Sequence, residues 1–302
     1  MTAKTEKILA RDIRALARAA TWIEDRRPEA EALMRELFPH TGRALVLGVT
    51  GPPGAGKSTL CDAFTARLRA EDKTVGILAV DPSSPYSGGA ILGDRVRMQR
   101  HHSDPGVFIR STATRGWLGG LARATTEMTL LLDAAGFDVV IVETVGAGQD
   151  EVEIARLADV ALVVLVPGMG DDVQAIKAGI MEIADVFVIN KADLPGADKL
   201  ERELKASLSL AHRPDGWTSK IVCTVASEGQ GIAEALAAAY EYSRRGADAE
   251  RKARIWSGRL REMLREQLLE RVPSEEFAAA GRDVAERRRD PYSILNDWLR
   301  KY

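Results

Sequence analysis

The stretch ALVLGVTGPPGAGKST, residues 44–59, joins a short apolar run to a glycine-rich turn. Its second half matches the P-loop pattern G-x-x-x-x-G-K-[ST]. In such a turn the backbone N–H groups point toward phosphate oxygens, Lys57 neutralises phosphate charge, and the Ser58 hydroxyl is a Mg²⁺ ligand. We therefore predict a strand, a phosphate-binding turn and a helix. The expected phosphate-binding residues are Gly51, Pro52, Pro53, Gly54, Ala55, Gly56, Lys57, Ser58 and Thr59.

Beyond this stretch, short runs rich in Val, Ile and Leu alternate with helical patterns. The runs are apolar on successive residues, which indicates strands buried on both faces. We expect an α/β protein with a mostly parallel β-sheet, covered by helices on both faces, whose functional loops follow the carboxyl ends of the strands. The predicted strands are ALVLGVT (44–50), TVGILAV (74–80), GVFI (106–109), DVVIVET (138–144), DVALVVLV (159–166), DVFVIN (185–190) and KIVCTV (220–225).

Helical patterns flank these strands on both sides. Before the first strand, apolar residues recur at helical spacing, and Pro28 separates two predicted helices. Near the other end, an amphipathic helix carries an apolar stripe from Trp256 to Val272, which packs either on its own domain or on a second copy or partner. We divide the chain into an N-terminal helical extension (1–42), a P-loop domain (43–246) and a C-terminal helical dimerisation segment (247–302).

Composition narrows the function classes. The 42 Lys and Arg against 44 Asp and Glu give a formal net charge of -2, so no basic excess favours a nucleic-acid partner. Cys61 and Cys223 are far apart, which argues against a Cys-built metal site and fits a reducing compartment. The longest apolar runs have strand length, and no apolar signal core is recognised. We expect a cytoplasmic protein that does not bind membranes.

The motif NKAD ends a late predicted strand and bears on the choice of base. The Asp193 carboxylate can accept from N1–H and the 2-amino group of guanine, whereas adenine offers neither donor at these positions. Lys191 can lie along the base, and Asn190 can tie this turn to the P-loop. The alternative role for Asp193 is a helix N-cap. The sequence therefore favours GTP and GDP over adenine nucleotides.

A second segment is expected to support the base. Where many GTPases have a Ser-Ala pair after a further strand, this chain reads TVASEG. Val225 and Ala226 stand in that place, so backbone amides there, together with Ser227, would have to contact the base.

Three carboxylates follow strands that end near the P-loop. Asp81 and Asp94 lie in VDPSSPYSGGAILGDR (80–95), and Glu143 ends DVVIVET with Gly146 three residues later, near the expected γ-phosphate. Mg²⁺ prefers hard oxygen ligands, so we assign these carboxylates and the Ser58 hydroxyl to its shell. The alternatives are a cap before the following proline for Asp81 and a salt bridge to a neighbouring arginine for Asp94.

Hydrolysis of a phosphoanhydride depends mainly on positioning and electrostatics. Besides Lys57 and Glu143, two residues are candidates for catalysis. Gln149, in VGAGQDE, can orient water, or else is a polar residue at a helix N-terminus. Arg115, in TATRGWLGGL, can reach phosphate or a partner, or else is a surface arginine. The nearby glycines indicate movable loops that respond to the γ-phosphate.

Taken together, these motifs and the closing DPYSILNDWL make the chain resemble the methylmalonyl-CoA mutase-associated GTPases, also labelled arginine/ornithine transport-system kinases. The resemblance implies a G domain of the SIMIBI class, flanking helical segments and a homodimer. It also implies that GTP hydrolysis gates delivery of adenosylcobalamin to a B12-dependent acyl-CoA mutase and protects that mutase. A cobalamin adenosyltransferase is a further expected partner. In the family, Asp81, Asp94 and Glu143 match positions around Mg²⁺.

Two other functions compete with this interpretation. A GTPase for nickel insertion would call for a His-rich tract or a Cys-pair site, and neither is found in the sequence. A kinase acting on a small molecule or a transport protein would need a base near an acceptor hydroxyl and would usually prefer ATP, contrary to NKAD.

Overall fold

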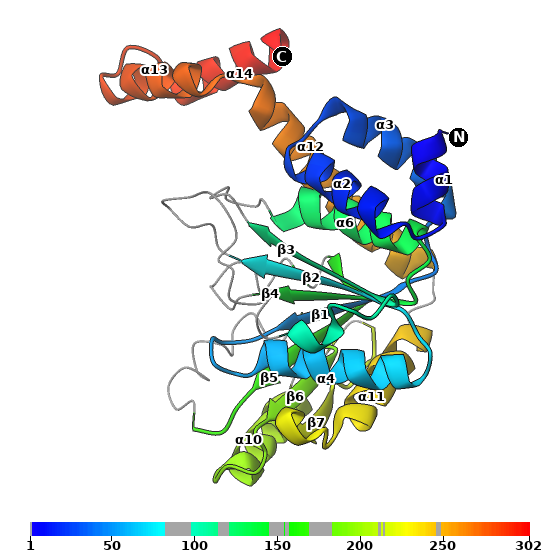
Figure 1. Ribbon diagram of the computed structural model, residues 1–302. Helices are drawn as coiled ribbons and strands as arrows, with labels where there is room; N and C mark the ends of the chain where they lie inside the picture. The colour runs from blue at the N-terminus through cyan, green and yellow to red at the C-terminus, as the bar shows by residue number, and fades with distance from the viewer. Residues whose placement is uncertain are drawn as a thin grey trace. The chain divides into compact units, whose positions relative to one another are not determined.

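The computed structural model describes residues 2–81, 98–113, 121–144, 154, 157–168, 183–210, 213, 215–245 and 249–302. In this part of the chain, seven strands form one sheet in the order β3-β2-β4-β1-β5-β6-β7, and all the paired neighbours are parallel (Figure 1). The predicted α/β fold is therefore confirmed. The strands are β1 (Leu45–Thr50), β2 (Val75–Asp81), β3 (Val107–Ala113), β4 (Val139–Thr144), β5 (Val160–Leu165), β6 (Val186–Asn190) and β7 (Lys220–Thr224).

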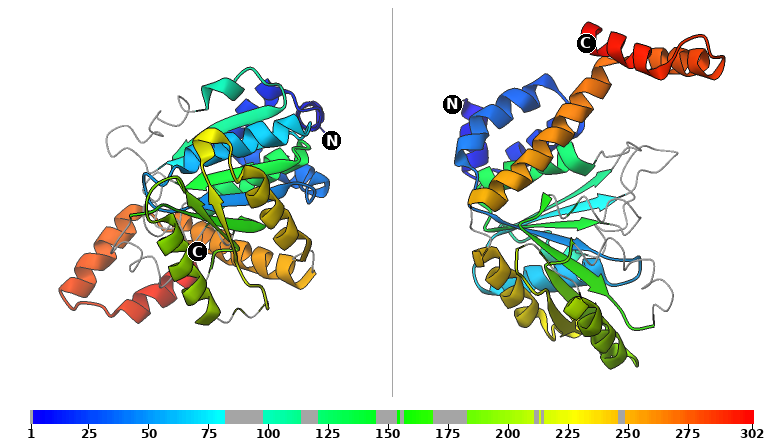
Figure 2. Two further views of the ribbon diagram at one scale, coloured as in Figure 1. Left: turned by 90° about the horizontal axis from the view of Figure 1, so that it is seen from below. Right: turned by 180° about the vertical axis from the view of Figure 1, so that it is seen from behind.

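Helices cover both faces of the sheet. Figure 1 and Figure 2 show α4 and α11 on one face, and α6 with the N-terminal helices on the other. The described helices are α1 (Ala3–Leu9), α2 (Ile13–Glu24), α3 (Pro28–Leu37), α4 (Lys57–Ala70), α6 (Leu121–Ala134), α10 (Ala197–Leu210), α11 (Ile232–Arg245), α12 (Ala249–Arg271), α13 (Ser274–Ala285) and α14 (Pro291–Lys301), with short 3-10 helices η1 (Phe38–His40), η2 (Gln99–His101) and η3 (Ala226–Glu228).

Alternation along the strands divides the core into two faces. In β4, Val139 and Ile141 join the cluster that contains residues of α4 and α11. Val140 and Val142 join the cluster that contains residues of α6 and the N-terminal helices. Successive side chains of a strand point to opposite faces, so both layers need apolar residues at adjacent positions. This requirement explains the unbroken apolar runs in the sequence.

The N-terminal extension consists of three α-helices, where the sequence predicted two. Pro28 begins α3, as expected, but a further break separates α1 from α2. Arg11 has a left-handed backbone (φ 60°), and the Asp12 side chain accepts from Ala15 N at 2.8 Å as the N-cap of α2. Apolar spacing continues through this break, so periodicity did not reveal it.

The chain divides into two compact units, residues 1–255 and 256–302. The second unit contains the later part of α12, then α13 and α14. Phe277 and Trp298 join α13 to α14, with ring centroids 4.7 Å apart. On α12, Leu260 and Leu264 are more than half exposed. The three-segment division at 42 and 246 and the dimerisation role both stay predictions.

Among the described helices, none combines the length and the apolar character needed to cross a bilayer.

Candidate nucleotide-binding site

The P-loop connects the central strand β1 to helix α4. Gly51 (φ 139°) and Gly56 (φ 85°) both adopt left-handed backbone conformations that favour glycine. A Cβ on Gly51 would lie 2.1 Å from the Val164 carbonyl oxygen of β5, and a Cβ on Gly56 would lie 2.4 Å from Asn190 Nδ2. Both glycines are therefore required by close neighbours, and the turn brings the N-terminus of α4 to the carboxyl edge of the sheet.

Lys57, the first residue of α4, is buried, and its ammonium lies against the loop. Its Nζ donates to the carbonyl oxygens of Gly51 at 2.7 Å and Pro52 at 2.9 Å. A lysine held in this way places its charge beside the turn that would surround phosphate oxygens. Pro53, Gly54 and Thr59 are exposed, whereas Ala55 is fully buried.

Ser58 and Glu143 meet at the first turn of α4. The Ser58 hydroxyl donates to Glu143 Oε1 at 2.6 Å, and both residues are buried. Glu143 continues the alternation of Val139 and Ile141, which face the α4 side of the sheet. The strand register therefore directs this carboxylate to the P-loop helix. Two of the residues assigned to the metal from the sequence therefore lie together, and their role as metal ligands stays a prediction.

Asn190, the last residue of β6, connects three segments of the site. Its Nδ2 donates to the Ala55 carbonyl at 2.9 Å, and its Oδ1 accepts from Thr224 Oγ1 and from Ala226 N, each at 3.1 Å. All these bonds are buried. The amide at the end of β6 thus holds the P-loop, the end of β7 and the start of η3 in fixed positions.

Lys191 and Asp193 follow directly in an exposed turn. Lys191 has a left-handed backbone (φ 54°), and its Nζ donates to the Gly54 carbonyl at 3.0 Å. Asp193 is exposed. Helix α10 begins four residues later, at Ala197, so Asp193 is not its N-cap. The N-cap alternative is thereby excluded for that helix, and the carboxylate of Asp193 is available to a ligand.

The TVASEG segment lies beside NKAD, as predicted, but one of its amides is already engaged. Val225 and Ala226 are buried and Ser227 is exposed. Ala226 N donates to Asn190 Oδ1, so in this structure it serves the loop connection. Thr224, whose buried hydroxyl also donates to Asn190, was missed by the sequence interpretation. The only available signal was a hydroxyl residue at the end of a strand.

Several predicted site residues lie outside the described residues. These are Asp94, Arg115, Gly146 and Gln149. Asp81 is the last residue of β2 and pairs with Ala113 of β3, but its side chain is outside the described part. Among the described residues, no group of three His, Cys, Asp or Glu side chains could hold a metal ion. The described donor set therefore consists of the Ser58 hydroxyl and the Glu143 carboxylate.

A parallel sheet with a P-loop after β1 and an N-K-x-D turn after β6 defines a P-loop GTPase. A family model described as methylmalonyl-CoA mutase-associated GTPase MeaB matches residues 16–279. The chain belongs to this family, and it is accordingly a GTPase that binds guanine nucleotides.

Relatives with related names span most of the chain. A Pyrococcus abyssi protein named as a GTPase is 47% identical and covers 98% of this chain and 95% of its own length. The mouse mitochondrial methylmalonic aciduria type A homolog is 40% identical over 67% of this chain and 51% of its own length. The crystal structure of an LAO/AO transport system kinase has a TM-score of 0.71 at 30% identity, covering 98% of this chain and 95% of that one.

Proposed function

We propose that this GTPase acts as a metallochaperone for a B12-dependent acyl-CoA mutase, of the methylmalonyl-CoA mutase kind. GTP binding and hydrolysis would gate delivery of adenosylcobalamin to the mutase and protect it from inactivation. The observation that carries the proposal is the match of residues 16–279 to a family described by its association with that mutase. The mouse relative, named for methylmalonic aciduria, also supports a role connected with methylmalonyl metabolism. A cobalamin adenosyltransferase is a further proposed partner.

The described residues fit a Mg²⁺ ion at the nucleotide site. The Ser58 hydroxyl and the Glu143 carboxylate are hard oxygen donors, buried and 2.6 Å apart at the start of α4. We propose that these two residues hold the ion, with Asp81 and Asp94 completing the shell directly or through water. The ion would neutralise charge on the β- and γ-phosphates. Lys57, whose ammonium lies against the Gly51 and Pro52 carbonyls, would supply a second positive charge.

The same proposal assigns roles to the remaining residues of the site. The P-loop amides would bind phosphate, Asp193 would accept from guanine, and Lys191 would lie along the base. Gln149 and Arg115 are proposed to act on the attacking water and on phosphate, and Gly146 to contact the γ-phosphate. The exposed leucines of α12 are proposed to pair with a second copy, as a homodimer would require.

Turnover in the presence of the partner tests this function. GTP hydrolysis by the chain is measured alone and with a B12-dependent acyl-CoA mutase loaded with adenosylcobalamin, and binding of the two proteins is measured separately. Lys57→Ala serves as the hydrolysis-deficient control. We expect a measurable complex and a change in turnover of at least several-fold. If the mutase neither binds nor changes the rate, the partner assignment is wrong.

A further inference from the structure

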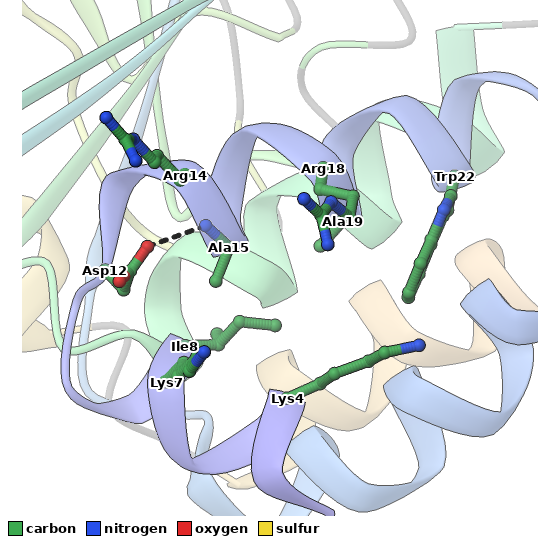
Figure 3. Close-up of a pocket in the computed structure, with 9 residues that line it drawn as sticks. All are labelled: Lys4, Lys7, Ile8, Asp12, Arg14, Ala15, Arg18, Ala19 and Trp22. Carbon is green, nitrogen blue, oxygen red and sulfur yellow. Dashed lines mark hydrogen bonds between the residues drawn. The ribbon is translucent and has the colours of Figure 1, made fainter.

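Helices α1 and α2 line a partly open hollow that is separate from the nucleotide site. Its volume is about 270 Å³, and its lining includes four cationic side chains and an indole ring (Figure 3). The cations are Lys4 and Lys7 of α1, and Arg14 and Arg18 of α2. Trp22 closes one end, with the Lys4 ammonium 4.4 Å from the ring centroid. No lining residue belongs to the P-loop, NKAD or TVASEG segments.

The charge of this hollow is largely uncompensated. Residues 4–18 carry five cations and two carboxylates, whereas the whole chain has a formal net charge of -2. Within the described part of the chain, none of the four lining cations forms an ion pair. The lining carboxylate, Asp12, accepts from Ala15 N as the N-cap of α2. The positive potential is therefore available to an anionic partner.

The floor of the hollow is apolar. Ile8 and Ala19 are each about 1% exposed, and Ala15 is half-buried between them and the rim. Two alanines one turn apart leave room that a larger side chain on α2 would fill. If the four cations were only a solvent-exposed helix face, an apolar cavity beneath them would not be expected. An apolar floor with a cationic rim suits a ligand that combines an apolar side chain with flanking carboxylates.

We propose that this hollow binds an acidic segment of the acyl-CoA mutase, which inserts one apolar side chain between α1 and α2 and pairs its carboxylates with the surrounding cations. This inference rests on the proposed function, because that function supplies the partner. Rim charges act mainly through the rate of association and its dependence on salt. The contact would thus steer the mutase to the GTPase without touching the nucleotide.

Binding of the mutase to full-length variants tests the proposal. The double variant Lys7→Glu/Arg18→Glu reverses one rim charge on each helix. The double variant Lys7→Gln/Arg18→Gln removes the same two positive charges without adding negative ones. Ala15→Leu fills the hollow and leaves every cation in place. The control, Arg43→Glu/Arg244→Glu, makes the same change in net charge at two exposed residues outside the lining. Thermal unfolding confirms that each variant folds, and basal GTP hydrolysis, which none should change, confirms that the nucleotide site is intact.

We expect the Glu/Glu variant to weaken mutase binding by about 10-fold or more, chiefly through slower association, and the Gln/Gln variant to weaken it less. Ala15→Leu should weaken binding without altering its salt dependence, and the control should bind as the wild type does. If all the folded variants bind the mutase equally well, the hollow is not a binding site for the mutase, whereas the proposed function of the chain still stands. If the wild-type chain does not bind the mutase, the proposed function is wrong, and so is the proposal that the hollow binds a segment of the mutase.

Discussion

At the scale of single residues, the nucleotide site depends on side chains that hold loops as much as on those that would contact the ligand. Position 56 requires glycine because a Cβ there would clash with Asn190 Nδ2. The Asn190 side chain in turn forms hydrogen bonds with the backbone of Ala55 and Ala226. The P-loop and the NKAD turn are thus fixed relative to each other by bonds within the protein, with no nucleotide needed.

Asn190→Ala should loosen this connection. The substitution leaves the Ala55 carbonyl, the Thr224 hydroxyl and the Ala226 amide without their partner, at a cost of about 1–3 kcal/mol in the free energy of unfolding. GTP affinity should fall as well, because the two loops lose their fixed spacing. Denaturant unfolding and calorimetry check both effects, with Asn296→Ala on the exposed side of α14 as the control. Unchanged stability would contradict the role given to Asn190.

Asp193→Asn should change which base is preferred. A carboxamide cannot accept from both N1–H and the 2-amino group of guanine, whereas it can donate to the 2-oxo group of xanthine. We expect GTP affinity to fall by roughly 10²-fold and xanthosine triphosphate to become the better ligand. Competition of both nucleotides against a fluorescent GDP analogue measures the change. Retained GTP preference in the variant would show that Asp193 does not contact the base.

At the scale of elements, the strands were predictable because burial on both faces leaves a plain pattern. Each of the seven apolar runs became a strand, and the loop motifs followed their carboxyl ends. The break between α1 and α2 was not predictable from periodicity, since it depends on one left-handed residue, Arg11, followed by a cap. The role of Thr224 was missed because it depends on contact with Asn190, distant in sequence.

Polar side chains also attach the N-terminal helices to the rest of the first unit. These contacts cannot be recognised from apolar patterns in the sequence. Arg110 of β3 donates to Glu24 at the end of α2, with Nε 3.2 Å from Oε1, and also to the Thr21 hydroxyl. Arg11 donates to the carbonyl oxygens of Ala135 and Gly136 after α6. The extension is therefore part of the first unit through polar contacts as well as through its core.

A double-mutant cycle on Arg110→Met and Glu24→Gln tests this attachment. Both side chains are about one-fifth exposed, so the pair is screened less than a surface salt bridge. We expect a coupling free energy of about 1 kcal/mol, measured by denaturant unfolding. Arg35 and Glu31, an exposed pair on α3, provide the matched control, whose coupling should be smaller. A coupling near zero for Arg110 and Glu24 would mean that this contact adds nothing to the attachment.

At the scale of the whole molecule, a polar cluster links the stability of the fold to pH. Its members are Asp185, Arg213, Asp215 and Tyr242. Arg213 donates to Asp185 and Asp215, and Tyr242 is within 3.3 Å of Asp215. Partial burial favours a raised pKa for Asp215, but hydrogen bonds from Arg213 and from Trp217 N outweigh it and lower the pKa to about 2. Because the unfolded value is 3.8, Asp215 stabilises the fold above that pH.

Asp215→Asn should therefore destabilise the protein near neutral pH and lose its effect in acid. The difference in melting temperature between wild type and variant should be full above about pH 4 and should shrink as the pH falls toward 2. Thermal unfolding followed across this range gives the difference directly. A difference that stays constant with pH would mean that the charge of Asp215 contributes nothing.

The whole molecule is proposed to recognise guanosine triphosphate through the P-loop, a magnesium ion and the NKAD turn. Phosphate release from GTP and from ATP, with and without Mg²⁺, tests it most directly, using the wild type beside Lys57→Ala. We predict release from GTP only, dependent on Mg²⁺ and lost in the variant, because the proposed site uses Lys57 and the ion to neutralise the transferred phosphate. Equal release from ATP, or undiminished release by Lys57→Ala, would contradict the account.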